Sequence, residues 1–139
     1  MEDQLKYAYL AGLFDGEGTV TLSRENSGIY KSPVLSMSST SFNLLEMCKT
    51  TFGGHISKQK VYKDHHKQSW SWKVRNNPAI TAAELLLPFI QEPEKKRRIT
   101  LLLTKYKDVT PRNGKYDETK RIAKLSFETE FFHPSNSLA

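Results

Sequence analysis

The most informative part of this sequence is Leu10-Ala11-Gly12-Leu13-Phe14-Asp15-Gly16-Glu17-Gly18. This stretch breaks two local rules of helix chemistry. Asp15 and Glu17 place negative charge at the end of a predicted helix, where the backbone dipole is already negative. Gly12 lies inside the same helix, at a cost of about 1 kcal/mol relative to alanine. Because natural sequences tend to break such rules at functional sites, we interpret the stretch as a candidate site.

A bound cation would offset the charge conflict at the helix end. Hard ions such as Mg²⁺ bind carboxylate and carbonyl oxygens together with water, and Asp15 and Glu17 supply two carboxylates. The small residues Ala11 and Gly12 would let a second backbone pack closely against the helix. From the residues alone, a solvated acidic helix end and a glycine without a purpose explain the stretch equally well.

Outside this stretch, hydrophobic spacing predicts helices and strand pairs in alternation. Apolar residues at helical spacing predict a first helix that glycine ends, and two alternating segments predict the strands that follow. A helix and two strands then recur. The predicted elements are a helix over 4–15, strands over 19–24 and 29–38 around a turn at 25–28, a helix through 44–48 that stops at 52–54, and strands over about 55–62 and 67–75 around a polar connection at 62–66.

The rest of the chain predicts helices. These are a helix that starts at Asn77-Pro78, a basic helix from about 94 and, after a break at 111–114, a last helix at about 117–130. The order αββαββα plus C-terminal helices predicts an α+β fold, in which an antiparallel four-stranded sheet has helices on one face. We expect one domain over residues 1–139, with its core at about 4–107 and a C-terminal helical extension at about 108–133.

The uncovered face of the predicted sheet is polar. Trp70, Trp72 and Val74 alternate with polar residues, so we expect the tryptophans to face the helices and the core. Polar side chains on a two-stranded ribbon can bond base edges in the major groove of DNA, although an ordinary solvated face has the same composition. The polar set comprises Thr19, Thr21, Ser23, Ser57, Gln59, Ser69, Ser71 and Lys73.

The net charge of +6 is concentrated in two segments. Residues 55–75 hold six basic residues against one acid, residues 95–124 hold eleven against three, and residues 1–54 hold four against six. This distribution indicates a polyanion as partner.

The single cysteine, Cys48, excludes an internal disulfide. Neither a membrane span nor a signal peptide is predicted, so we expect a soluble intracellular protein of the cytoplasm, nucleoid or an organelle matrix.

The nine residues quoted above resemble the LAGLIDADG motif, the signature of a family of homing endonucleases. Six of the nine letters are identical, and Glu17 replaces the second aspartate of the motif with another acid. Phe14 stands for isoleucine and Gly16 for alanine, and both changes leave the carboxylate positions intact. The predicted order of elements is the one expected of the family, and the resemblance covers about residues 4–107.

The resemblance implies a homodimer, because this sequence holds one copy of the motif. The motif helices of two subunits would pack together at Ala11 and Gly12. Each helix end would deliver Glu17 as the acid that binds Mg²⁺ or Mn²⁺, with the carbonyl of Gly16 as a further ligand. Asp15, the motif's first acid, belongs to the candidate catalytic set in a supporting role. A catalytic lysine is expected at the start of the basic helix, where the candidates are Lys95, which aligns best, and Lys96.

The resemblance also implies that the sheet forms a saddle over the major groove of double-stranded DNA. A polar residue near the end of the second strand would hold water, and the candidates are Ser36, Ser38 and Ser39, with Met37 as the residue that takes their place. The predicted DNA-binding set is Thr19, Thr21, Ser23, Ser36, Ser38, Ser57, Gln59, Lys60, Lys67, Ser69, Ser71 and Lys73.

The implied function is a metal-dependent, sequence-specific endonuclease. It would hydrolyse phosphodiester bonds of double-stranded DNA at a long, partly palindromic target, in association with an intron or an intein. The alternatives are an RNA maturase that helps an intron to fold, a non-cleaving DNA-binding regulator on the same fold, and an unrelated basic protein. The histidines do not suggest a zinc site, and the adjacent pair His65-His66 is expected to face DNA or solvent.

Overall fold

Two helix–hairpin units build the sheet in this computed structural model, which describes residues 2–24, 28–61 and 67–134. The units comprise α1 (Asp3–Glu17), β1 (Gly18–Arg24), β2 (Lys31–Ser39), α2 (Phe42–Phe52), β3 (His55–Lys58) and β4 (Trp70–Arg75). The chain then continues through α3 (Asn76–Leu86), η1 (Leu87–Phe89), α4 (Pro93–Leu101), η2 (Leu102–Tyr106), η3 (Lys107–Val109) and α5 (Glu118–Phe132). The expected α+β order αββαββα is confirmed, and helices follow it.

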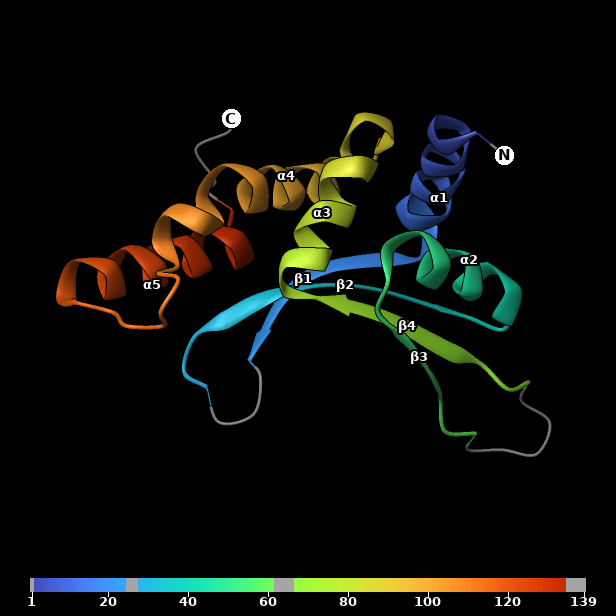
Figure 1. Ribbon diagram of the computed structural model, residues 1–139, viewed down its shortest axis with the longest axis horizontal. Coiled ribbons are helices and arrows are strands. Elements are labelled where there is room, and N and C mark those ends of the chain that lie inside the picture. The colour runs from blue at the N-terminus through green and yellow to red at the C-terminus, as the bar shows by residue number, and fades with distance from the viewer. Residues whose placement is uncertain (1, 25–27, 62–66, 135–139) are drawn as a thin grey trace.

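All strand pairs are antiparallel, and the strands lie side by side in the order β1-β2-β4-β3. Figure 1 shows α1, α2 and α3 over one face of the sheet, while the other face stays uncovered. The strands curve away from the helices at both ends, so the sheet arches (Figure 1). Helices α4 and α5 lie at the end of the molecule that is farther from α1.

The covered face of the sheet is apolar because most residues that alternate onto it are buried hydrophobic side chains, although Val34 and Ser71 on the opposite face are buried as well. Val20 pairs with Leu35, and Leu35 pairs in turn with Val74, so three strands share one hydrophobic row. Trp72 is buried in the next row and its Nε1 donates to the carbonyl of Gly53 at 2.8 Å. The prediction that Trp72 belongs to the core is therefore confirmed.

The second tryptophan, Trp70, lies on the same side of the sheet but is only half-buried. Its ring meets that of Phe42 edge-on, with the ring centroids 5.5 Å apart. Trp70 is the first residue of β4 and pairs with Lys58, the last residue of β3, so the sheet ends beside it. Cys48 is buried in the core, as expected for a small apolar side chain.

The predicted end of the first helix is wrong by two residues. Helix α1 continues through Gly16 and Glu17, and Gly18 follows in extended geometry, with φ −87° and ψ 163°. A Cβ on Gly18 would lie 2.2 Å from the ring of Phe14. Gly18 is therefore needed for close packing, and it does not act as a left-handed helix stop.

The second hairpin has shorter strands than predicted. The strand β3 ends at Lys58, short of the expected 62, and β4 begins at Trp70 rather than 67. The pairing continues by one further hydrogen bond, from Gln59 N to Ser69 O at 2.9 Å, in a stretch without apolar alternation. Most of the turn predicted at 25–28 and all of the connection at 62–66, including His65 and His66, lie outside the described residues.

Six of the eleven basic residues of 95–124 have partners within the chain, so only part of the positive charge in this segment is available to a polyanion. Arg97 pairs with Glu94 at 2.8 Å and donates to the carbonyl of Phe131 at 2.7 Å, so it holds α4 against the end of α5. Arg98 donates to the carbonyl of Val20 at 2.8 Å. The residues with partners within the chain are Lys95, Arg97, Arg98, Lys105, Arg121 and Lys124.

Lys124 is the one cation of this group that is enclosed, with 1% of its surface exposed. Its Nζ donates to Thr110 Oγ1 at 2.5 Å and lies 4.2 Å from the centre of the Tyr106 ring. Burial lowers the pKa of Lys124 from 10.5 to about 8, although Glu128 nearby favours the charged form.

No helix in the described part of the chain is long and apolar enough to cross a membrane.

The buried Lys124 contributes more to the stability of this protein as the pH rises above 8, whereas Cys48, whose pKa burial raises from 9.0 to about 11, contributes less above pH 9 in wild type and Lys124 variant alike. Between the folded pKa of about 8 and the ordinary value of 10.5, the unfolded chain holds a proton on Lys124 that the folded chain lacks. The contribution of Lys124 to the free energy of unfolding therefore increases with pH in this window. Lys124→Met removes the contribution of this group. From pH 7 to pH 9.5 the free energy of unfolding of the wild type should therefore rise by on the order of 1 kcal/mol more than that of the variant.

Urea unfolding of both proteins at several pH values measures this difference. Burial also raises the pKa of Tyr116, whose own contribution falls above pH 10 in both proteins, so the comparison stays below that pH. A difference between the two proteins that does not change with pH would contradict the prediction.

Candidate active site

Glu17 lies at the point where α1 runs directly into the sheet. It is the last residue of α1 and is exposed, and Gly18 after it pairs with Met37 on β2. The N–H of Gly18 donates to the carbonyl of Phe14, so the helix ends in a regular turn. This geometry leaves the Glu17 carboxylate at a helix C-terminus, where the backbone already contributes negative potential.

Asp15 faces a different environment from Glu17. Its carboxylate accepts hydrogen bonds from the backbone N–H groups of Gln91 and Glu92, at 3.1 Å each. These bonds tie the last turn of α1 to the segment that leads into α4. Asp15 was expected in the catalytic set, and its observed contacts fit the supporting role rather than direct contact with a metal ion.

The start of α4 places Lys95 against the end of α1. Glu92 caps α4, because its carboxylate accepts from the N–H groups of Glu94 at 3.1 Å and Lys95 at 2.7 Å. Lys95 Nζ donates to the carbonyl of Phe14 at 3.0 Å and to that of Asp15 at 2.5 Å. Lys96, the alternative candidate, is exposed, and its side chain has no such acceptor among the described residues. Of the two lysines, Lys95 is therefore the one beside the motif helix.

The oxygen donors at the end of α1 fit a hard divalent cation. Glu17 supplies an exposed carboxylate, and Gly16 lies in the last helical turn, where carbonyls have no partner within the helix. Carboxylate and carbonyl oxygens are the ligands that Mg²⁺ prefers. Among the described residues no group of three or more His, Cys, Asp and Glu side chains could hold a metal ion. Further oxygens would have to come from water, nucleic acid or a second subunit.

The strand register brings the predicted polar set onto the uncovered face of the sheet. One row joins Thr19, Ser36, Lys73 and His55 across all four strands, and the next row joins Ser38, Ser71 and Ser57. Within the second row Ser71 is buried, so it has little surface for contact with DNA. The remaining predicted strand residues, Thr21 and Ser23, continue the same face along β1.

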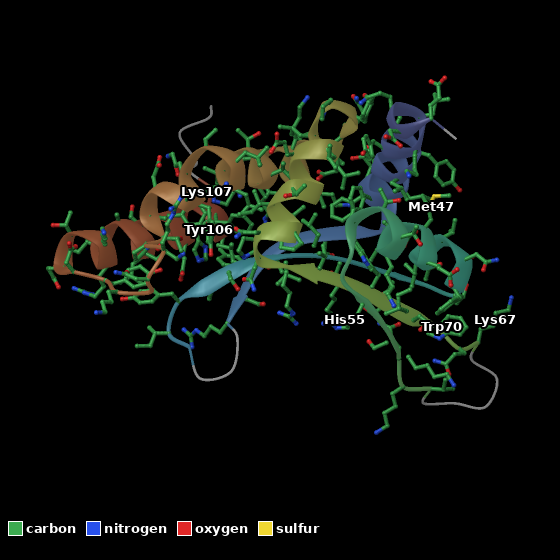
Figure 2. The ribbon with its side chains drawn as sticks, in the orientation of Figure 1. Met47, His55, Lys67, Trp70, Tyr106 and Lys107 are labelled. Atoms are coloured by element: carbon green, nitrogen blue, oxygen red, sulfur yellow. The ribbon has the colours of Figure 1, made fainter. Side chains whose placement is uncertain are left out.

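Beyond the paired strands, the face continues through a short chain of hydrogen bonds. Gln59 donates through Nε2 to Ser38 Oγ at 3.0 Å and accepts from Ser69 Oγ at 2.6 Å. Lys60, which comes after β3, and Lys67, which comes before β4, are both exposed. Figure 2 shows His55 and Lys67 on the second hairpin.

The register also separates the four candidates for a water-positioning residue. Met37 pairs with Trp72 and is buried on the helix side. Ser39 pairs with Trp70, and its Oγ accepts from the N–H of Ser41 at 2.9 Å, ahead of α2. Ser36 and Ser38 lie on the polar face and remain as candidates.

Sequence reasoning missed Arg75 and His55 as residues of the polar face. Arg75 pairs with Val34, and its Nη1 donates to Ser23 Oγ at 3.3 Å, so it bridges β4 and β1 over β2. The signal was present, because Arg75 continues the alternation of Ser69, Ser71 and Lys73 by one more step. It had been counted only as part of a basic segment.

The predicted dimer contact is partly wrong. Ala11 has 0% of its surface exposed and belongs to this chain's own core, so it has no surface for a second subunit. The helix is rotated so that Leu10, Ala11 and Phe14 face the sheet. Gly12 is exposed, and a Cβ there would have no atom within 4 Å.

The chain matches the model of the LAGLIDADG endonuclease family over residues 10–110. It belongs to this family. No curated protein sequence matches the chain.

Solved structures of homing endonucleases share the fold at low sequence identity. I-CvuI in complex with its target in the presence of Ca has a TM-score of 0.73 and 20% identity, over 96% of this chain and 84% of that chain. The archaeal intron-encoded I-Vdi141I complexed with DNA has a TM-score of 0.62 and 18% identity, over 99% and 89%. I-SmaMI, bound to uncleaved DNA target in the presence of calcium ions, has a TM-score of 0.59 and 21% identity, over 96% of this chain but 47% of that chain.

The two acids of this LAGLIDADG motif should differ in their effect on stability. Asp15→Ala removes the acceptor of two backbone N–H groups, so we expect a loss of about 1–3 kcal/mol. Glu17→Ala removes an exposed charge that the helix dipole disfavours, so stability should stay the same or rise by a few tenths of a kcal/mol. Urea denaturation of the two variants measures the contrast. Equal losses would contradict the structural role given to Asp15.

Proposed function

We propose that this LAGLIDADG endonuclease cuts double-stranded DNA at a specific sequence as a symmetric homodimer that uses Mg²⁺ or Mn²⁺. The observation that carries the proposal is that Lys95 Nζ donates to the carbonyls of Phe14 and Asp15 at the end of α1, where Glu17 is exposed, on a fold with an uncovered polar sheet face. The arched sheet lies along the major groove, where Thr19, Lys73 and Arg75 contact base edges and phosphates.

The residues of the site divide the reaction between them. Glu17, with the carbonyl of Gly16, would hold the metal ion. The metal ion, when bound, activates a water molecule and neutralises charge on the phosphate. Lys95 places a positive charge against the end of α1 and stabilises the charge that develops on the phosphate oxygens. Asp15 keeps α1 and the start of α4 together, so that Glu17 and Lys95 stay on the same side of the DNA.

Two subunits are needed because each chain supplies one metal-binding acid. The outer side of α1 carries Leu5, Tyr9, Gly12 and Gly16 at helical spacing, with Leu5 60% and Tyr9 44% exposed. Packing this stripe against its copy in a symmetric dimer would bury the two apolar side chains. It would also bring two Glu17 residues toward the dimer axis. The match to 47% of the I-SmaMI chain is consistent with a longer chain that has room for two such units.

A library experiment tests the activity and identifies the target. The protein is incubated with Mg²⁺ and a library of random duplexes, and the ends of the cut molecules are sequenced. Double-strand cuts at one partly palindromic sequence support the proposal. Specific binding without cuts would favour the non-cleaving regulator, and binding of a structured intron RNA without DNA cutting would favour the maturase.

We predict that Glu17→Gln abolishes cleavage but keeps DNA binding. The amide has nearly the volume of the carboxylate and lacks the charge that holds the metal ion, so the cleavage rate should fall by orders of magnitude. Binding should persist, because phosphate and base contacts come from the sheet face. Glu46→Gln, the same change at an exposed acid of α2, is the matched control and should cut at the wild-type rate. Wild-type cleavage by Glu17→Gln would remove Glu17 from the site.

We also predict that Gly12→Leu weakens the dimer without harming the fold. The position is open within the chain, and leucine favours helix more than glycine by about 1 kcal/mol, so monomer stability should not fall. The larger side chain should hold two α1 helices apart. Sedimentation equilibrium measures the dimer constant, with Gly12→Ala as the smaller change. A wild-type protein that is monomeric both free and on DNA would exclude the symmetric model.

A further inference from the structure

A cavity of about 470 Å³ lies between the start of α3 and the segment after α4. It is lined by Asn77, Tyr106, Lys107, Thr110, Pro111 and Arg112. Figure 2 shows Tyr106 and Lys107 together near α5, at the opposite end of the molecule from Met47 on α2. No acid lines the cavity, so all its charged lining groups are positive.

The two cations of the cavity differ from most of their neighbours in the C-terminal part. Arg97, Lys105 and Arg121 each form an ion pair within the chain. Lys107 and Arg112 are exposed, and neither side chain has an ion-pair partner within the described residues. Asp108, the acid next to Lys107 in sequence, is not among the lining residues. Their charges are therefore available to an anion.

A third cation, Lys124, lies in contact with two of the lining residues, although Glu128 is also near it. The buried Lys124 donates to the hydroxyl of Thr110 at 2.5 Å and packs on the Tyr106 ring, and both of these residues line the cavity. Asn77 belongs to the first turn of α3, a helix of 11 residues without a side-chain cap. Its N-terminus contributes further positive potential toward the same space.

The cavity begins where the polar face ends. Arg75, the last residue of β4, lies on that face opposite Val34, and Asn77 follows two residues later. A duplex that runs along the face and past Arg75 would bring its sugar–phosphate backbone to this end of the domain. The chemistry of the lining suits a phosphodiester, since Lys and Arg donate only and Asn77 adds an amide donor.

We propose that this cavity binds a backbone phosphate of the target duplex, outside the bases that the sheet face contacts. The proposal rests on the DNA-binding function given above and extends its footprint. Phosphate contacts of this kind set register and affinity and carry no sequence information. The cavity therefore adds affinity to every duplex to about the same extent, and the sheet face alone decides which sequence is chosen.

The test compares two pairs of substitutions that remove the same charge. Lys107→Ala with Arg112→Ala empties the cavity of its cations, whereas Lys49→Ala with Lys120→Ala removes two exposed lysines from α2 and α5. Binding to the duplex recovered from the library is measured against salt concentration, with Ca²⁺ in place of Mg²⁺. The cavity variant should lose about 0.9 in the slope of log K against log salt for each subunit. The control variant should keep the wild-type slope.

Ethylation interference on the same duplex locates the contact. One phosphate at the flank of each half-site should block the wild type when ethylated and be neutral for the cavity variant. Equal slopes for both double variants, an unchanged interference pattern, or an altered base preference in the cavity variant would overturn the proposal. Failure of the endonuclease function appears separately, as the absence of Mg²⁺-dependent cuts by the wild type. A duplex that the protein binds but does not cut can still be used to compare the cavity variant with the control variant.

Discussion

The hydrogen bonds between the end of α1 and the start of α4 hold the candidate site together. Asp15 accepts from the backbone before α4, Glu92 caps that helix, and Lys95 returns to the carbonyls of Phe14 and Asp15. This closed set of contacts places Lys95 beside Glu17, although the two residues are far apart in sequence. It also places a positive charge where the helix dipole and two acids would otherwise repel one another. Lys95 thus offsets part of the charge conflict visible in the motif from within the chain.

The sheet depends on the same helix, because Glu17 leads into β1 without a loop. Once Gly18 is paired with Met37, every later residue of β1 has a fixed side of the sheet. The apolar side is covered by α1, α2 and α3, and the polar side is left open across all four strands. An antiparallel sheet tolerates this division, because one face can be packed while the other is solvated. The distance from Glu17 to each row of the polar face is therefore set by the strand register.

Local sequence patterns predict much of this structure, and the remaining features depend on long-range packing. Period-2 alternation predicts the two faces correctly from Thr19 to Lys73, because each strand shows its own pattern. The rotation of α1 about its axis is not local, so Ala11 was assigned to a contact between subunits when it lies in the core. The choice between Lys95 and Lys96 needed the cap by Glu92. The sequence shows the positive charge of residues 95–124 but not the groups that these residues contact. Arg97, for example, contacts the end of α5 only in the folded chain.

Helix α1 serves three purposes on separate sides, and this explains its composition. Leu10, Ala11 and Phe14 fill the core, so this side tolerates no polar residue. The outer side carries Gly12, where the loss of helix propensity is justified only if another backbone packs there, since the chain itself leaves that space open. The end of the helix presents Glu17 to solvent at an electrostatic cost. A single chain gains nothing from the last two features. In the proposed complex a second α1 would fill the space at Gly12, and a metal ion would offset the charge of Glu17, so the proposed dimer would account for both features of this helix.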